Sequence, residues 1–292
     1  MKAYIFPGQG SQFKGMAKEL FKNKLGEKIF KESDEILGFK ISEIMLEGSI
    51  EELKKTKVTQ PSIFIFSVIL SKLLNKSFKP DAVAGHSLGE FSALAAAEGM
   101  SFSDGLLLVK KRAEAMHKAC ELKKGTMAAI LGMKDKYVED ICNNVKEVVV
   151  AANFNCPGQV VISGEFNAVE NTCEKLIKEG AKRAIILPVH GAFHSPLMDS
   201  AKNELEKAIN NTSFKAPICP IYQNFTSLAE TDPGLIKINL INQLTGPVKW
   251  NQTIKNMISD GTKKFIETGP GNVLQGLNKK IDINIETVKA EF

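Results

Sequence analysis

The chain has 292 residues, 43% of them apolar, which suffices for one large domain with an insertion or for two domains. Its net charge of +5 is spread along the chain without a basic run, which argues against nucleic-acid binding but permits steering of an acidic partner. No apolar run reaches the roughly 18 residues of a membrane span and no signal-peptide pattern begins the chain, so we expect a cytoplasmic protein. Its five cysteines form no C-x-x-C pair, so we expect reduced thiols and no metal site.

The first predicted element is a strand over residues 2–6, followed by a glycine-rich loop, Pro7-Gly-Gln-Gly-Ser-Gln12. A phosphate-binding loop needs a lysine and a Ser or Thr at the start of the next helix, and neither stands there. Two interpretations stay open for this loop. It either carries a backbone N–H toward an oxyanion or is a plain connecting turn.

Residues 13–57 are charged and are predicted to be mostly helical. Pro61 is then predicted to occupy the first turn of a helix that contains the apolar run 63–74. For Gln60 we favour a role at the entry of this helix over a polar contact near a site.

The stretch from Asp81 to Glu90 contains Gly-His-Ser-Leu-Gly, which fits the G-x-S-x-G pattern of a nucleophile elbow. Residues 82–84 are predicted to form a buried strand and residues 90–98 a helix, so Ser87 would lie in the sharp turn between them. The glycines avoid a clash in so tight a turn. Ser87 is therefore a candidate for covalent acyl transfer, and the alternative is a glycine-rich turn with an incidental serine.

The next helix is predicted to run from an N-cap at Ser103 to about Leu122. Val109, Arg112 and Met116 share one face of it because they are three and four residues apart. A guanidinium on this largely apolar face must find an anion if it is buried. Three interpretations stay open: a clamp on a substrate carboxylate, an internal salt bridge, or a snorkelling side chain.

Residues 125–189 show the predicted order β-α-β-β-α-β, which is the ferredoxin-like motif. We predict that this block is a small subdomain inserted into a large α/β domain made of residues 1–124 and 190–292. Asn153 and Asn155 either face the cleft between the two or are ordinary turn residues.

Two of the four histidines, His190 and His194, lie where the chain returns to the large domain, and such junctions line clefts. His194 comes just before a predicted helix N-terminus at Ser195 and is our preferred base for Ser87, with a solvated or structural ring as the alternative. His86 adjoins Ser87 within the elbow and is expected to point away from it.

Eight stretches together resemble the malonyl-CoA:acyl carrier protein transacylases of bacterial fatty acid synthesis. They are Phe6-Pro-Gly-Gln-Gly-Ser-Gln12, Thr59-Gln-Pro61, Gly85-His-Ser-Leu-Gly-Glu90, Arg112, Asn153-Phe-Asn-Cys-Pro-Gly-Gln-Val-Val-Ile-Ser-Gly164, Gly191-Ala-Phe-His-Ser-Pro196, Gln243-Leu-Thr-Gly-Pro-Val-Lys-Trp250 and Glu267-Thr-Gly-Pro-Gly271. They follow the family's order over nearly the whole chain. The resemblance favours an α/β-hydrolase-like large domain with a parallel sheet and an inserted ferredoxin-like subdomain.

The resemblance implies that Ser87 takes the malonyl group as an ester and that His194 is the general base and later the general acid. A backbone carbonyl, here that of Gln243, would orient the histidine in place of an acid. The backbone N–H groups of Gln9 and Leu88 would form the oxyanion hole. The substrates would be malonyl-CoA and an acidic acyl carrier protein bound transiently, with no cofactor, and we expect a monomer.

The resemblance also implies that Arg112 holds the free carboxylate of malonate. The residues implied to line the cleft from the small subdomain are Asn153, Asn155 and Gln159. Phe193 matches a position where malonyl-specific relatives carry phenylalanine. His190 departs from the family, which has a small residue such as serine there.

Two other functions stay open. An ordinary serine esterase needs an acid between Ser87 and His194 in chain order, for which Asp104, Asp135 and Asp140 are available. A non-enzymatic module that binds a carrier protein would contain an inert serine.

Overall fold

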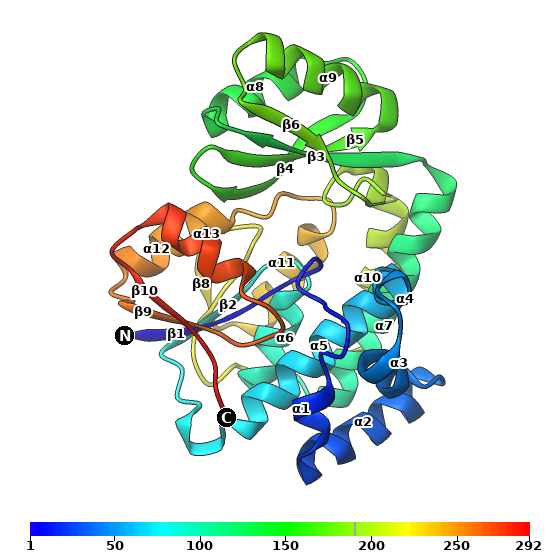
Figure 1. Ribbon diagram of the computed structural model, residues 1–292, viewed down its shortest axis with the longest axis vertical. Helices are drawn as coiled ribbons and strands as arrows, with labels where there is room; N and C mark the ends of the chain where they lie inside the picture. The colour runs from blue at the N-terminus through cyan, green and yellow to red at the C-terminus, as the bar shows by residue number, and fades with distance from the viewer. Residues whose placement is uncertain (190) are drawn as a thin grey trace.

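The computed structural model describes residues 1–189 and 191–292, so His190 and its departure from the family lie outside the described residues. The chain folds around two sheets, with strand orders β10-β9-β1-β2-β7-β8 and β4-β5-β3-β6 (Figure 1). The strands are β1 (Lys2–Phe6), β2 (Ala82–Gly85), β3 (Gly125–Leu131), β4 (Val149–Cys156), β5 (Gln159–Glu165), β6 (Arg183–Ile186), β7 (Ile221–Tyr222), β8 (Ala229–Glu230), β9 (Lys264–Glu267) and β10 (Glu286–Lys289).

The helices cover both sheets. The α-helices are α1 (Lys18–Phe21), α2 (Lys24–Leu37), α3 (Ile41–Glu47), α4 (Ile50–Leu53), α5 (Thr56–Leu73), α6 (Gly89–Ala96), α7 (Phe102–Leu122), α8 (Asp135–Asn143), α9 (Phe166–Lys178), α10 (Asp199–Asn210), α11 (Pro233–Gln243), α12 (Trp250–Ser259) and α13 (Val273–Ile281). Two short 3-10 helices are η1 (Asn75–Ser77) and η2 (Pro196–Met198). Within the two described ranges, no helix is long and apolar enough to cross a membrane.

The six-stranded sheet is parallel from β10 to β7, and only β8 runs antiparallel to its neighbour. Side chains of β1 alternate between its faces, because successive residues of a strand point to opposite sides. Ala3 and Ile5 pack in the core that contains residues of α12 and α13, whereas Tyr4 and Phe6 pack in the core of α5, α6 and α7. Helices thus cover both faces, as the predicted α/β-hydrolase-like fold requires, and the predicted fold class is confirmed.

The four-stranded sheet is antiparallel and has the strand order of the ferredoxin-like motif that the sequence predicts. Ala128 and Ile130 pack under α8 and α9, which cover the outer face of this sheet (Figure 1). Met127 and Ala129 point the other way, toward the core of the six-stranded part. The division into a small domain of residues 125–189 and a large domain of residues 1–124 and 190–292 stays a prediction.

Backbone hydrogen bonds join the small sheet to the large part of the molecule beside the elbow. Phe154 N donates to Val248 O at 2.9 Å, and Val248 N donates to Ala152 O at 2.8 Å. The loop that follows α11 therefore pairs with β4 like an additional short strand. This pairing places β4 over the carboxyl end of β2, where the elbow lies.

Two predicted helix starts are wrong. Helix α5 begins at Thr56, so Pro61 lies inside it rather than in its first turn. Burial of the stretch from Val58 to Ser71 outweighs the loss of one backbone hydrogen bond at the proline. Helix α7 is capped by Ser101, whose side chain accepts from Asp104 N, while Ser103 donates its hydroxyl to Glu32.

Candidate active site

The elbow has the geometry that its sequence predicts. Strand β2 ends at Gly85, Ser87 has a left-handed φ of 53°, and α6 starts at Gly89. A Cβ atom at Gly85 would collide with the backbone of Gly89, and one at Gly89 would collide with the backbone of Phe6. The predicted reason for both glycines, close packing in a tight turn, is therefore confirmed.

Ser87 and His194, which are 107 residues apart in the sequence, meet in the structure. Ser87 Oγ lies 2.8 Å from His194 Nε2, and His194 Nδ1 lies 2.8 Å from the backbone oxygen of Gln243. A carbonyl oxygen only accepts, so Nδ1 carries the ring proton and Nε2 of the neutral ring accepts from the serine hydroxyl. The pair is arranged as a nucleophile and its base, with a peptide carbonyl as the group that orients the base.

His194 lies in a setting that keeps it neutral. The side chain is buried, and its backbone has a left-handed φ of 57°. Burial, assisted by the positive charge of Arg112, lowers the pKa of His194 to about 3, while its bond to Gln243 acts in the opposite direction. At neutral pH the ring is thus able to take a proton from Ser87.

This pKa predicts an unusual pH profile for the reactivity of Ser87. The folded pKa of His194 lies below its ordinary value, so the base form persists as the pH falls through 6.5 and is lost only near pH 3. The rate of inactivation by a phosphonofluoridate should therefore stay flat between about pH 4 and pH 8. A decline with a midpoint near 6.5, in protein that circular dichroism shows to be folded, contradicts the buried neutral ring.

Two residues of the cavity that contains Ser87 have a backbone N–H group without a hydrogen-bond partner in the described ranges. Gln9 follows β1 in the glycine-rich loop, Leu88 is the N-cap residue that precedes α6, and both line the cavity that contains Ser87. Leu88 N lies at the positive end of a helix. Both are available to donate to a negatively charged oxygen that forms next to the serine.

Arg112 is almost fully buried, at 1% exposure, and is hydrogen-bonded only to neutral groups in the described part of the chain. Its Nη1 donates to Gln60 Oε1 at 2.7 Å, and its Nη2 donates to Ser87 Oγ at 3.0 Å and to Gln243 Oε1 at 3.3 Å. Nε has no partner among the described residues. Burial lowers its pKa to about 10, so the guanidinium stays charged at neutral pH.

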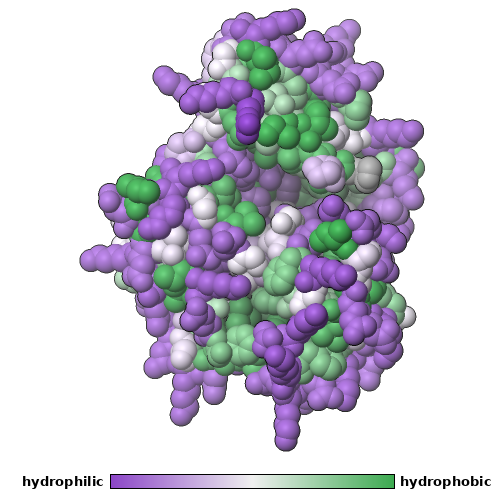
Figure 2. Space-filling view, in the orientation of Figure 1, coloured by the Kyte–Doolittle hydropathy of each residue, from purple (hydrophilic) through white to green (hydrophobic). Residues whose placement is uncertain are grey.

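These residues surround a small cavity between the elbow and the small sheet. Its volume is about 120 Å³, and its wall includes His194, Arg112, Phe193, Met116 and Met127. The surface is hollowed between the small-sheet lobe and the rest of the molecule (Figure 2). A neighbouring cavity of about 750 Å³ shares Gln9, Val189 and Phe193 with the first.

The small domain contributes a different set of side chains to the cavity than the sequence predicts, namely Met127, Asn153, Leu187 and Val189. Asn153 lines it, and its Oδ1 has no partner within the described residues. Asn155 instead lies 2.9 Å, Oδ1 to Nε2, from His86, and neither Asn155 nor Gln159 is part of the wall. His86 thus joins the elbow to β4.

Sequence reasoning missed several polar residues at the site. Gln60 is buried, contacts Arg112 and lines the cavity, so our preference for a helix-entry role was wrong. Asn224 Oδ1 accepts from Ser87 N at 2.6 Å. Glu90 is buried beneath the elbow. The only sequence signal was that each polar side chain interrupts or adjoins an apolar run.

The chain is similar to known proteins over nearly its whole length. Residues 3–287 match the family model described as an acyl transferase domain. The chain is 43% identical over 291 residues to a malonyl CoA-acyl carrier protein transacylase of Bacillus subtilis, a match that covers 98% of this chain and 92% of the relative.

Solved structures give the same result. The malonyl CoA-acyl carrier protein transacylase from Coxiella burnetii superimposes with a TM-score of 0.95 at 35% identity, covering 99% of this chain and 93% of that one. A type II PKS acyl-carrier protein in complex with its malonyl-transacylase also matches, with a TM-score of 0.95 at 34% identity and coverage of 100% and 96%.

Proposed function

The chain belongs to the acyl transferase family, and from this premise we propose that it transfers the malonyl group of malonyl-CoA to the phosphopantetheine thiol of acyl carrier protein. The observation that carries the proposal is the meeting of Ser87, His194 and a buried, charged Arg112 in one cavity of about 120 Å³. The relatives named above as malonyl transacylases support the choice of acyl group.

The first half of the reaction forms an ester on the enzyme. Ser87 Oγ attacks the thioester carbonyl of malonyl-CoA while His194 Nε2 takes the hydroxyl proton. The carbonyl oxygen becomes negatively charged and is stabilised by the N–H groups of Gln9 and Leu88. The C–S bond then breaks, and the coenzyme A sulfur leaves as a thiol with the proton from His194.

The second half reverses these roles. The carrier-protein thiol gives its proton to His194, and its sulfur attacks the ester carbonyl. When the bond between that carbon and Ser87 Oγ breaks, the proton returns from His194 to the serine. One thioester is thus exchanged for another with no net change in protons or electrons, which a ping-pong route through an oxygen ester accomplishes.

Arg112 is proposed to bind the free carboxylate of the malonyl group. In the malonyl ester three carbon atoms extend from Ser87 Oγ, the last being the carboxylate carbon, and Arg112 Nη2 already contacts Oγ at 3.0 Å. A buried guanidinium favours an acyl group that brings an anion over one that leaves it unpaired. The small cavity also limits access of water to the ester.

The larger cavity is proposed to hold the pantetheine arm of either thiol substrate. Its wall includes the apolar residues Val58, Phe39 and Pro188, and it shares Gln9, Val189 and Phe193 with the catalytic cavity. The lysines in its wall are Lys54, Lys55 and Lys57. Their charge favours the phosphates of coenzyme A and an acidic carrier protein. We propose a monomer that acts in fatty acid synthesis and binds no nucleic acid.

The test is transfer of the label from malonyl-CoA to the enzyme. Protein incubated with radiolabelled malonyl-CoA should gain one malonyl group on the peptide that contains Ser87, and Ser87→Ala should gain none. Addition of carrier protein with its phosphopantetheine arm should move the label to that thiol. Folded wild-type protein that stays unlabelled contradicts the proposal.

The same experiment separates the two other functions. A serine esterase would release free malonate steadily without a thiol acceptor. A module with an inert serine would neither take the label nor react with a phosphonofluoridate.

A further inference from the structure

A buried carboxylate that the proposed mechanism does not use lies beneath the elbow. Glu90 Oε1 accepts from Gln223 Nε2 at 2.9 Å, and its Oε2 accepts from Asn224 N at 2.8 Å and from Gln243 Nε2 at 3.0 Å. All three partners are N–H donors, which suits the ionised acid. Burial raises the pKa of Glu90, while these three bonds and the charge of Arg112 act in the opposite direction.

One of the three partners, Gln243, contacts Ser87, His194 and Arg112. Its backbone oxygen holds His194 Nδ1, and its side-chain Nε2 donates to the backbone oxygen of Ser87 at 3.0 Å as well as to Glu90. Its Oε1 accepts from Arg112 Nη2 at 3.3 Å. Because Glu90 only accepts, it fixes which end of the Gln243 amide faces Arg112.

A second partner, Asn224, holds the elbow itself. Its Oδ1 accepts from Ser87 N, and its Nδ2 donates to the backbone oxygen of Gly85 at 2.6 Å. The bond from Asn224 N to Glu90 anchors this residue from behind. Glu90 thus supports the nucleophile from two directions.

The negative charge of Glu90 also stabilises the positive charge of Arg112. Within the described residues Arg112 forms no ion pair at 4 Å or less, and Glu90 is the carboxylate whose charge favours the protonated guanidinium. A buried charge without an opposite charge nearby is costly. Glu90 therefore balances Arg112 before any acyl group binds.

We propose that Glu90 is a positioning residue for acyl transfer, which fixes Gln243 and Asn224 around Ser87 and balances the charge of Arg112. The proposal rests on the proposed function. It makes two separate predictions. The hydrogen bonds that Glu90 accepts should affect the rate of acylation, and the negative charge of Glu90 should affect the affinity for an anionic acyl group.

The test compares Glu90→Gln with Glu90→Asp. In Glu90→Gln the amide NH₂ faces at least one N–H donor in either orientation, so single-turnover acylation by malonyl-CoA should slow by about 10- to 100-fold. Removal of the negative charge should tighten binding of malonyl-CoA by about 3- to 10-fold, measured by calorimetry in the Ser87→Ala background, but not binding of acetyl-CoA. Glu90→Asp should slow acylation yet leave malonyl-CoA binding near the wild-type value.

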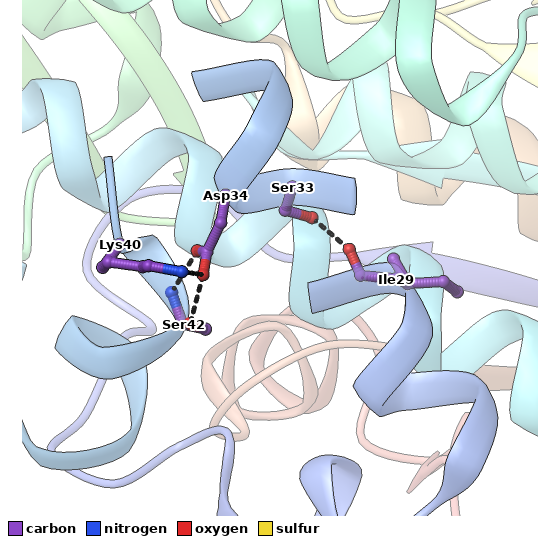
Figure 3. A network of polar contacts seen from close by, with 5 residues as sticks. All are labelled: Ile29, Ser33, Asp34, Lys40 and Ser42. Atoms are coloured by element: carbon purple, nitrogen blue, oxygen red, sulfur yellow. Dashed lines mark hydrogen bonds and ion pairs between the residues drawn. The ribbon is translucent and has the colours of Figure 1, made fainter. Parts of the chain in front are cut away.

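Asp34→Asn is the matched control, because Asp34 is another mostly buried carboxylate and lies outside the site. It accepts from Ser42 N at 3.0 Å and from Ser42 Oγ at 2.7 Å, with Lys40 Nζ at 3.6 Å (Figure 3). This variant should lower thermal stability without changing acylation or the preference between the two acyl groups.

The outcomes are distinct. Wild-type acylation and wild-type binding in folded Glu90→Gln overturn the proposal, as does an equal change for malonyl-CoA and acetyl-CoA. If the wild type itself is not acylated, the proposed function fails instead. If Glu90→Gln does not fold, Gln223→Met removes one donor to Glu90 from the far side, and an unchanged acylation rate there overturns the proposal.

Discussion

Arg112→Ala is expected to lower kcat/KM for malonyl transfer by about 10⁴-fold, equivalent to about 5 kcal/mol of transition-state stabilisation. The reason is that the cavity loses its buried positive charge, so the malonyl carboxylate would enter an enclosed site without a counter-ion. The rate of acetyl transfer should stay the same or increase in Arg112→Ala. An acetyl group has no carboxylate to pair with the guanidinium, so it loses no favourable contact when Arg112 is removed. The measurement is kcat/KM with malonyl-CoA and acetyl-CoA.

Lys111→Ala provides the control for this experiment. Lys111 is the neighbour of Arg112 in α7 but is exposed, so its loss should change neither rate appreciably. Circular dichroism must show that Arg112→Ala is folded, because Gln60 Oε1 loses its hydrogen-bond donor. An equal loss with both acyl groups removes Arg112 from its proposed role as a carboxylate clamp.

His194→Ala is expected to slow acylation of Ser87 by about 10²- to 10⁴-fold, the range typical of a general base. Without the ring, the hydroxyl proton has no acceptor at 2.8 Å, and the remaining contact from Arg112 is a donor rather than a base. Single-turnover labelling with malonyl-CoA measures the effect directly.

Imidazole added to the buffer supplies the control. The alanine leaves space for a free imidazole, which should restore part of the acylation rate in His194→Ala and none in Ser87→Ala. If His194→Ala is acylated as fast as the wild type, another base acts on the serine.

The confirmed predictions concern local patterns. The strand, turn and helix of the elbow follow from a short apolar run, two glycines and a helical run, all within residues 82–98. The β-α-β-β-α-β order of the small sheet also follows from hydrophobic periodicity along the chain. The two predicted helix starts at Ser103 and Pro61 were wrong for different reasons. Near Ser103, Ser101 is an equally good cap and is the one used. At Pro61, burial of the helix outweighed the local preference of proline for a first turn.

The site was less predictable from the sequence than the elements were. The sequence pattern alone placed Arg112 on an apolar face, but whether its charge faced an internal acid or a substrate stayed open. Asn155 illustrates the limit, because the same residue type suits a turn or a cleft and in the structure it contacts His86. Its proposed role in substrate binding stays a prediction.

By itself, the sequence determined the elements, the elbow and the family, because each of these depends on residues close together in the chain or on motifs in a set order. Only the tertiary structure decided that Ser87 meets His194, that Gln60 and Gln243 hold Arg112, and that Glu90 lies behind them all. These contacts join residues from about 50 to 150 positions apart, and hydrogen bonds depend on distances and angles that packing sets. Periodicity along a chain contains no such information.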